Sequence, residues 1–190
     1  MQQENTNLII WASNYAESLL VPLGKRWVHV QGVVERAKCV SQALNEDDAT
    51  YLITVAYLHD IGYAPSLQKT GFHPLDGACA LQADGKDRLA SLVAYHSESP
   101  FEAQLRGYTQ ELNYFPREHS IVADALTYCD MTTGPAGEHV TFEERIADIL
   151  HRYGKASLVS QAIQQATPNL SATVTRVQSL LREKGLMCDA

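Results

Sequence analysis

The sequence contains no apolar run long enough to cross a membrane and no cluster of basic residues. A membrane-spanning helix needs about 20 consecutive apolar residues, and the N-terminal Met-Gln-Gln-Glu-Asn lacks the positive charge that opens a secretory signal. With 15 Lys and Arg against 22 Asp and Glu, the formal net charge of −7 indicates no positive surface for nucleic acid or for an anionic membrane. We therefore expect a cytoplasmic protein that binds neither.

The sequence is also poor in cysteine. Its four cysteines, Cys39, Cys79, Cys129 and Cys188, lie far apart and form no C-x-x-C pair. A disulfide framework is typical of small secreted domains, whereas cytoplasmic thiols are kept reduced. We therefore expect reduced thiols.

Alternating segments rich in valine and isoleucine, bounded by hairpin turns, are missing as well, so we expect little or no sheet. Apolar residues instead recur at steps of three and four along most of the chain, which is the period of an amphipathic helix. This pattern predicts helices over residues 27–44, 46–61, 74–83, 86–95, 118–130, 142–153 and about 170–184. At 190 residues the chain is most simply one all-α domain.

The helix that begins near residue 46 is predicted to be central. Asn45 is a suitable N-cap, and Asp47 and Asp48 favour the first turn. The helix is apolar on nearly all sides, which is typical of a buried helix. It is expected to end at Gly62, because Pro65 prevents its continuation.

Six histidine and aspartate side chains lie on the inward faces or at the ends of these helices. They are His29, His59, Asp60, His73, His96 and Asp130. His59 follows Val55 by four residues and so extends the buried face of the central helix. Asp130 follows Leu126 by the same step. Because a buried carboxylate without a partner is very costly, we interpret these residues, which converge from separate helices, as ligands of a metal site.

The ordered pattern H…HD…H…H…D resembles the HD-domain superfamily, the helical metal-dependent phosphohydrolases. The resemblance covers roughly residues 26–153, so that helices over about 5–20 and 157–184 are accessory. It implies that His29, His59, Asp60 and Asp130 are the four ligands common to the superfamily. His73 and His96 match the two further ligands of its two-metal branches.

The segment His59-Asp60-Ile61-Gly62 is similar to the HDIG type, but other positions differ from the HD-GYP branch. Tyr63 replaces its usual lysine, Ser97 replaces the second histidine of a His-His pair, and the GYP signature is missing. A related hydrolase is therefore expected, and a cyclic-di-nucleotide phosphodiesterase is not.

The resemblance implies a binuclear site in which Asp60 bridges two cations. His29, His59 and Asp130 would complete one shell, and His73 and His96 the other. Mixed nitrogen and oxygen ligands suit two divalent transition-metal ions, which could be manganese, iron, cobalt, nickel or zinc. The expected function is hydrolysis of a phosphoester in a small molecule or nucleotide by a metal-bridging hydroxide.

Two other functions use the same ligand pattern. It also resembles the diiron HD-type oxygenases such as myo-inositol oxygenase, which activate dioxygen with an iron pair. A non-catalytic regulatory HD module is the third alternative. Metal content and oxygen uptake would separate these three.

Residues outside the ligand set are candidates for binding the substrate. Lys69 lies between the HDIG segment and His73, and Arg145 follows the loop after Asp130, so each is a candidate catalytic contact to phosphate. The loop 132–134 is expected to line the pocket. Glu98 is either a partner of a ligand histidine or a surface residue. The flanking helices are expected to complete the core or to form the seam of a homodimer.

Overall fold

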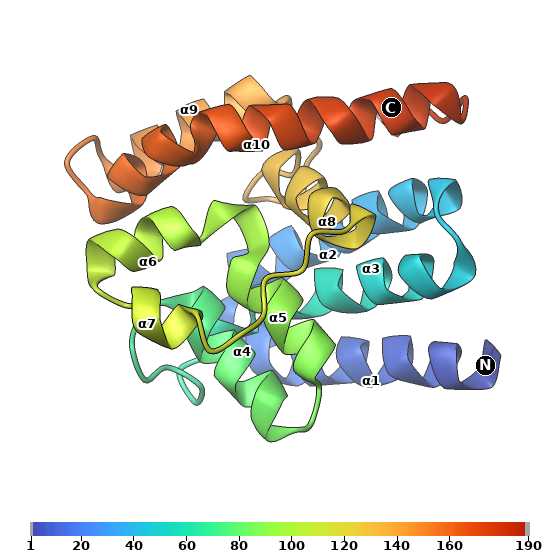
Figure 1. The fold of residues 1–190 in the computed structure, drawn as a ribbon, viewed down its shortest axis with the longest axis horizontal. Helices are drawn as coiled ribbons and strands as arrows, with labels where there is room; N and C mark the ends of the chain where they lie inside the picture. Colours follow the sequence, from blue (N-terminus) through green and yellow to red (C-terminus); the bar gives the residue numbers. More distant parts are fainter. Residues whose placement is uncertain (1, 189–190) are drawn as a thin grey trace.

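The computed structural model describes residues 2–188, which form ten α-helices and four short 3-10 helices (Figure 1). The α-helices are α1 (Gln2–Leu20), α2 (Lys25–Val40), α3 (Glu46–Leu58), α4 (His73–Ala83), α5 (Asp87–Tyr95), α6 (Pro100–Arg106), α7 (Thr109–Leu112), α8 (Ile121–Met131), α9 (Phe142–Tyr153) and α10 (Leu158–Glu183). The 3-10 helices are η1 (Val21–Leu23), η2 (Ser41–Ala43), η3 (Ile61–Tyr63) and η4 (His96–Glu98). One isolated bridge between Thr133 and His139 is the only β pairing within residues 2–188, so the all-α prediction is confirmed.

Helix α3 lies at the centre of the molecule, as its apolar sequence predicts. Asn45 caps it by accepting a hydrogen bond from the Asp48 backbone, and Leu52, Val55 and Leu58 are fully buried. It packs against α1, α2, α5 and α8. In Figure 1, α10 lies along one side of the molecule and α1 along the other. The carboxyl end of α3 therefore delivers its polar residues into the interior.

The turn after α3 is held tightly against the start of α4. A Cβ atom added at Gly62 would lie 2.0 Å from the His73 carbonyl oxygen and 2.7 Å from the Gly77 nitrogen. Both neighbours are backbone atoms and cannot rotate away, so only glycine fits here. This contact fixes the first residue of α4 beside η3.

Several parts of the helix prediction differ from the structure. Helices α6 and α7 are not among the predicted helices, because each is shorter than the window over which a helical period is recognisable. The helices expected over residues 27–44 and 46–61 end earlier, at Val40 (α2) and Leu58 (α3), and a short 3-10 helix follows each. Helix α10 (Leu158–Glu183) spans the accessory helix expected over about residues 157–184 and continues through Pro168. No helix within the described residues is long and apolar enough to cross a membrane.

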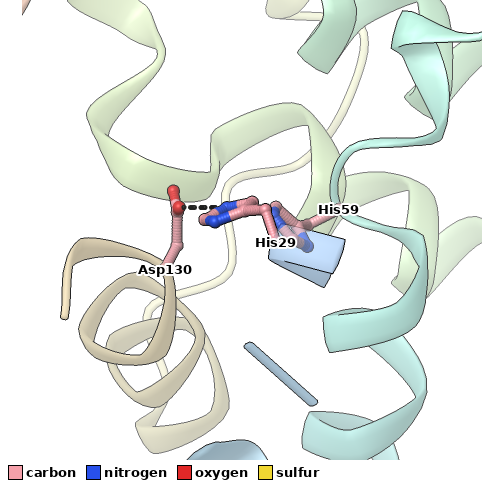
Figure 2. Close-up of side chains that lie close together, drawn as sticks. All are labelled: His29, His59 and Asp130. Atoms are coloured by element: carbon pink, nitrogen blue, oxygen red, sulfur yellow. Dashed lines mark hydrogen bonds and ion pairs between the residues drawn. The ribbon is translucent and has the colours of Figure 1, made fainter. Parts of the chain in front are cut away.

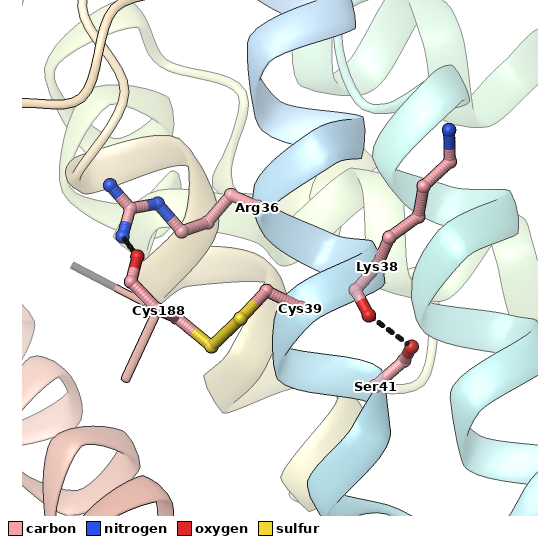
Figure 3. The surroundings of a disulfide bond; sticks show 5 residues. All are labelled: Arg36, Lys38, Cys39, Ser41 and Cys188. Carbon is pink, nitrogen blue, oxygen red and sulfur yellow. Dashed lines mark hydrogen bonds between the residues drawn. A yellow bond between two sulfur atoms is a disulfide. The ribbon is translucent and has the colours of Figure 1, made fainter. Parts of the chain in front are cut away.

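The prediction of reduced thiols is wrong for two of the four cysteines. Cys39 in α2 and Cys188 near the C-terminus form a disulfide (Figure 3), with a Cα–Cα distance of 5.8 Å. The two residues are 149 positions apart, so their spacing in sequence gives no sign of the contact. Arg36 supports it by donating to the Cys188 carbonyl and, at 3.3 Å, to the Thr132 carbonyl. Cys79 and Cys129 are free.

Candidate metal centre

The structure brings all six predicted ligands together from five elements. His29 comes from α2, His59 and Asp60 from the end of α3, His73 from the start of α4, His96 from η4, and Asp130 from α8. Their ligand atoms form two groups, and within each group the atoms lie within 4.8 Å of one another. The first group is His29, His59 and Asp130 (Figure 2), and the second is Asp60, His73 and His96.

Three of the histidines are oriented by backbone carbonyls. The Nδ1 atoms of His29, His59 and His96 lie 3.0, 2.8 and 2.6 Å from the carbonyl oxygens of Gly134, Ala56 and Val93. A carbonyl oxygen only accepts, so each Nδ1 donates and the Nε2 atom of each ring is left to face the centre. This arrangement of a fixed tautomer is typical of histidines that bind metal.

The first group fits a cation at the position between its side chains. His29 Nε2 lies 3.1 Å from Asp130 Oδ1, although the Nδ1 hydrogen is already donated elsewhere. His29 Nε2 can therefore donate to Asp130 only when it also carries a proton, and a cation between the two atoms would take the place of that proton. His59 Nε2 is buried without a hydrogen-bond partner in the described part of the chain, which costs about 1–3 kcal/mol. A metal ion between these side chains would bind both His29 Nε2 and His59 Nε2, so the three residues fit the metal site that the sequence predicts.

Asp60 faces both groups with different oxygens. Its Oδ1 lies 3.3 Å from His73 Nε2, while its Oδ2 lies 3.4 Å from His59 Nε2 and 3.9 Å from His29 Nε2. His73 Nε2 and His96 Nε2 are 3.3 Å apart. A carboxylate that presents one oxygen to each of two imidazole clusters has the geometry of a ligand that bridges two cations.

Both carboxylates are held in their ionised form. Burial by itself would raise the pKa of Asp60, but the charges of Arg26 and then His59 hold this pKa well below its usual value. For Asp130, the same effect of burial on the pKa is outweighed by the hydrogen bond with His29 and by the charge of Arg145. Each carboxylate is therefore ready to bind a cation without first losing a proton.

The histidines of the second group are held in their neutral form. Burial lowers the pKa of His73 well below its usual value. Burial also lowers the pKa of His96, and the neighbouring His59 lowers it further. Neutral imidazole is the form that binds a metal ion, so burial favours the ligating state of both rings.

Arg26 belongs to the centre, although the sequence analysis does not single it out. Its Nη1 donates to Asp60 Oδ2 over 2.6 Å, and its guanidinium lies 3.9 Å from the centre of the Tyr63 ring. Tyr63 in turn stacks on His73, with ring centres 4.1 Å apart. The available signal is its position three residues before His29, which places both side chains on one face of α2.

Ser97 stands where HD-GYP proteins have a second histidine, and it forms a hydrogen bond with Asp130, one of the predicted metal ligands. Its hydroxyl donates to Asp130 Oδ2 over 2.5 Å. Ser97 and Glu98 both have positive φ angles, of 49° and 57°, a backbone conformation that is costly for residues with a side chain. Glu98 forms an ion pair with Arg117 at 2.7 Å, in keeping with its interpretation as a residue outside the ligand set.

The two predicted phosphate contacts occupy different places. Arg145 is 6% exposed and donates from Nη2 to Asp130 Oδ1 over 3.3 Å. It lines the pocket over the centre together with Asp60, His73, His96 and Asp130. Lys69 is exposed and does not line that pocket.

The loop after Asp130 contributes through its backbone. The Gly134 carbonyl binds His29, whereas the hydroxyls of Thr132 and Thr133 donate to the carbonyls of Tyr128 and Cys129, within α8. The hydroxyls are thereby engaged by the helix, and none of the three loop residues lines the pocket over the centre.

The comparison with protein families agrees with the fold and with this site. The model of the HD domain matches residues 26–153, so the chain belongs to the HD domain family, a superfamily of metal-dependent hydrolases. The match is to the HD domain in general, and the HDIG subtype remains a prediction. Neither the curated proteins nor the solved structures compared with this chain gave a match.

Proposed function

We propose that the chain is a binuclear metal-dependent phosphohydrolase that cleaves a phosphoester of a small molecule or nucleotide. The observation that carries this proposal is the position of Asp60, whose two oxygens face two separate clusters of imidazole nitrogens. Two cations, when bound, supply Lewis acidity and a strongly acidified water. The residues that would hold them are His29, His59 and Asp130 on one side and His73 and His96 on the other, with Asp60 shared.

The chain's own residues orient the ligands and bind the substrate. Backbone carbonyls hold three histidines in one tautomer, and Arg26 and Ser97 fix the carboxylates of Asp60 and Asp130. Arg26 and Arg145 line the pocket over the centre. Guanidinium groups bind phosphoryl oxygens with good geometry and oppose the negative charge that develops on them. These contacts support phosphoryl transfer and require no nucleophilic side chain.

The test is phosphate release from a panel of phosphomonoesters and phosphodiesters, with protein loaded separately with manganese, iron, cobalt, nickel or zinc. We expect turnover with at least one metal. Asp60→Asn and His59→Ala should each lower it about 100-fold or more, since the metal contributes several kcal/mol. His119→Ala is the matched control, because His119 is exposed and outside both ligand groups.

Two outcomes would overturn the proposal. Oxygen consumption by the iron-loaded protein, without phosphate release from any ester, would indicate a diiron oxygenase instead. Stable binding of two ions with neither reaction would indicate a regulatory module. Both outcomes would leave the ligand assignment intact, which separates an error about the reaction from an error about the site.

A further inference from the structure

Building on the proposed hydrolysis, we propose that a cationic pocket beside the metal centre binds a second anionic group of the substrate. The substrate class is then a phosphoester that carries another phosphate or a carboxylate. The pocket, called here the cationic pocket, is lined by Lys25, Arg26, Arg145 and Arg152 and borders the candidate ligand His29. No carboxylate of the described residues lines it, although the whole chain has a net charge of −7.

The size and location of the cationic pocket suit part of a larger ligand. Its volume is about 190 Å³, whereas one water molecule needs about 10–15 Å³. Arg26, Arg145 and Arg152 also line the pocket that contains Asp60, His73 and His96. These three arginines therefore lie along the boundary between the metal centre and the cationic pocket. A substrate held by one anionic group at the centre could place a second group against the same side chains.

Arg145 has donors that the protein itself does not use. The residue is 6% exposed, yet its Nε and Nη1 have no hydrogen-bond partner among the described residues. Nη1 lies 3.5 Å from Asp148 Oδ2, an ion-pair distance without a hydrogen bond. Buried donors are normally satisfied, and an unsatisfied one requires an explanation. Arg145 also lines the cationic pocket, so an anion bound there would lie beside a guanidinium group with unused donors.

The other cations of the pocket differ in how far they are already neutralised. Arg152 is bound to Asp148 at 2.8 Å, and Arg26 to Asp60 at 2.6 Å. Lys25 is exposed and has no carboxylate partner within residues 2–188. Cations bound at the centre would share the charges of Asp60 and Asp130, leaving more of the charge of Arg26 and Arg145 for an anionic ligand. The pocket is then most strongly cationic in the metal-loaded protein.

The experiment measures binding of phosphonates, which cannot be hydrolysed, by titration calorimetry with metal-loaded protein. Methylphosphonate carries one anionic group, phosphonoacetate adds a carboxylate, and propane-1,3-diphosphonate adds a second phosphonate. We expect at least one two-anion ligand to bind about tenfold more tightly than methylphosphonate, the gain from one charge-assisted contact. Whichever two-anion ligand shows the larger gain in affinity over methylphosphonate identifies the second anionic group of the substrate as a carboxylate or a phosphate.

Variants test whether this gain in affinity comes from the cationic pocket. Lys25→Gln and Arg152→Gln should each reduce the tenfold preference to threefold or less. Lys184→Gln removes the same charge from a residue that lines neither pocket and should keep the preference. Metal content after each titration shows whether a ligand has removed the ions, and circular dichroism confirms folding of each variant.

Equal affinity for all three phosphonates would overturn the proposal, and so would a preference that Lys25→Gln and Arg152→Gln leave intact. Failure of the proposed hydrolysis is detected separately. In that case no phosphoester is cleaved, while the preference for two-anion ligands and its loss in the variants persist.

Discussion

Arg26 Nη1 and Asp60 Oδ2 lie 2.6 Å apart, so an arginine neutralises the same carboxylate that faces both imidazole clusters. Asp60 is 3% exposed, and an ionised carboxylate at such a site needs a partner. In protein without metal, Arg26 provides the largest single opposing charge. With cations bound, that contribution becomes partly redundant. The stability that Arg26 provides should therefore depend on metal.

Arg26→Gln should destabilise the metal-free protein more than the metal-loaded protein. We expect a loss of about 2–3 kcal/mol in chelator, less than the 3–5 kcal/mol for a fully buried pair, because the Arg26 side chain is 23% exposed. Saturating metal should reduce this loss by at least half. Denaturant unfolding, followed by circular dichroism with and without metal, measures both values.

Arg88→Gln is the matched control for this prediction. Arg88 forms an ion pair with Glu118 at 2.9 Å, and neither residue belongs to a ligand group or lines the pocket over the centre. The loss of stability that Arg88→Gln causes should be the same with and without metal. An Arg26→Gln defect that metal does not reduce would show that Arg26 acts through packing alone.

The two ligand groups predict a stepwise loss of metal. Protein purified without chelator or nickel affinity should contain about two transition-metal ions per chain. The double variant His73→Ala, His96→Ala removes two of the three residues of one group and should retain one ion or none. Elemental analysis measures this directly. An unchanged metal content in the double variant would exclude His73 and His96 from the site.

The sequence was sufficient to place His59 and Asp130 in the interior because each one continues an apolar helical face. His59 and Asp130 follow buried residues at helical spacing, and this local rule survives folding. The same rule predicts α4, α5 and α9 to within one residue at each end. What could be predicted is therefore what depends on neighbours within one helix.

Contacts between distant segments could not be predicted in this way. Helical periodicity does not specify which residue of α2 meets the C-terminus, so the bond between Cys39 and Cys188 was outside its reach. Lys69 is the opposite case: it lies close to His73 in the sequence, but its exposed side chain does not line the pocket over the metal centre. Arg26 was missed because its partner Asp60 lies 34 residues away.

Gly62→Ala should disrupt the second ligand group. The added methyl would lie 2.0 Å from the His73 carbonyl oxygen, so α4 must move. We expect a loss of about 1–3 kcal/mol in unfolding free energy and the loss of the ion held by Asp60, His73 and His96. Elemental analysis and denaturant unfolding measure the two effects.

Gly107→Ala separates this clash from the general effect of replacing a glycine. Gly107 has a positive φ of 80°, but no atom lies within 4 Å of an added Cβ. It should cost about 1–2 kcal/mol through backbone strain and leave the metal content unchanged. If Gly62→Ala also kept both ions, the fixed contact between η3 and α4 would not be what positions His73.

The disulfide should stabilise the fold by linking α2 to the C-terminal segment. It closes a loop between residues 149 positions apart, and such a bond typically contributes about 2–4 kcal/mol. Reduction with dithiothreitol should therefore lower the melting temperature of the parent protein but not that of Cys39→Ser. Cys79→Ser is the control, because Cys79 is free and exposed, and this variant should respond to reduction like the parent.

Thiol titration of the unreduced, unfolded parent should find two free thiols, those of Cys79 and Cys129. Four free thiols, together with a melting temperature that dithiothreitol does not change, would show that the bond does not form in solution.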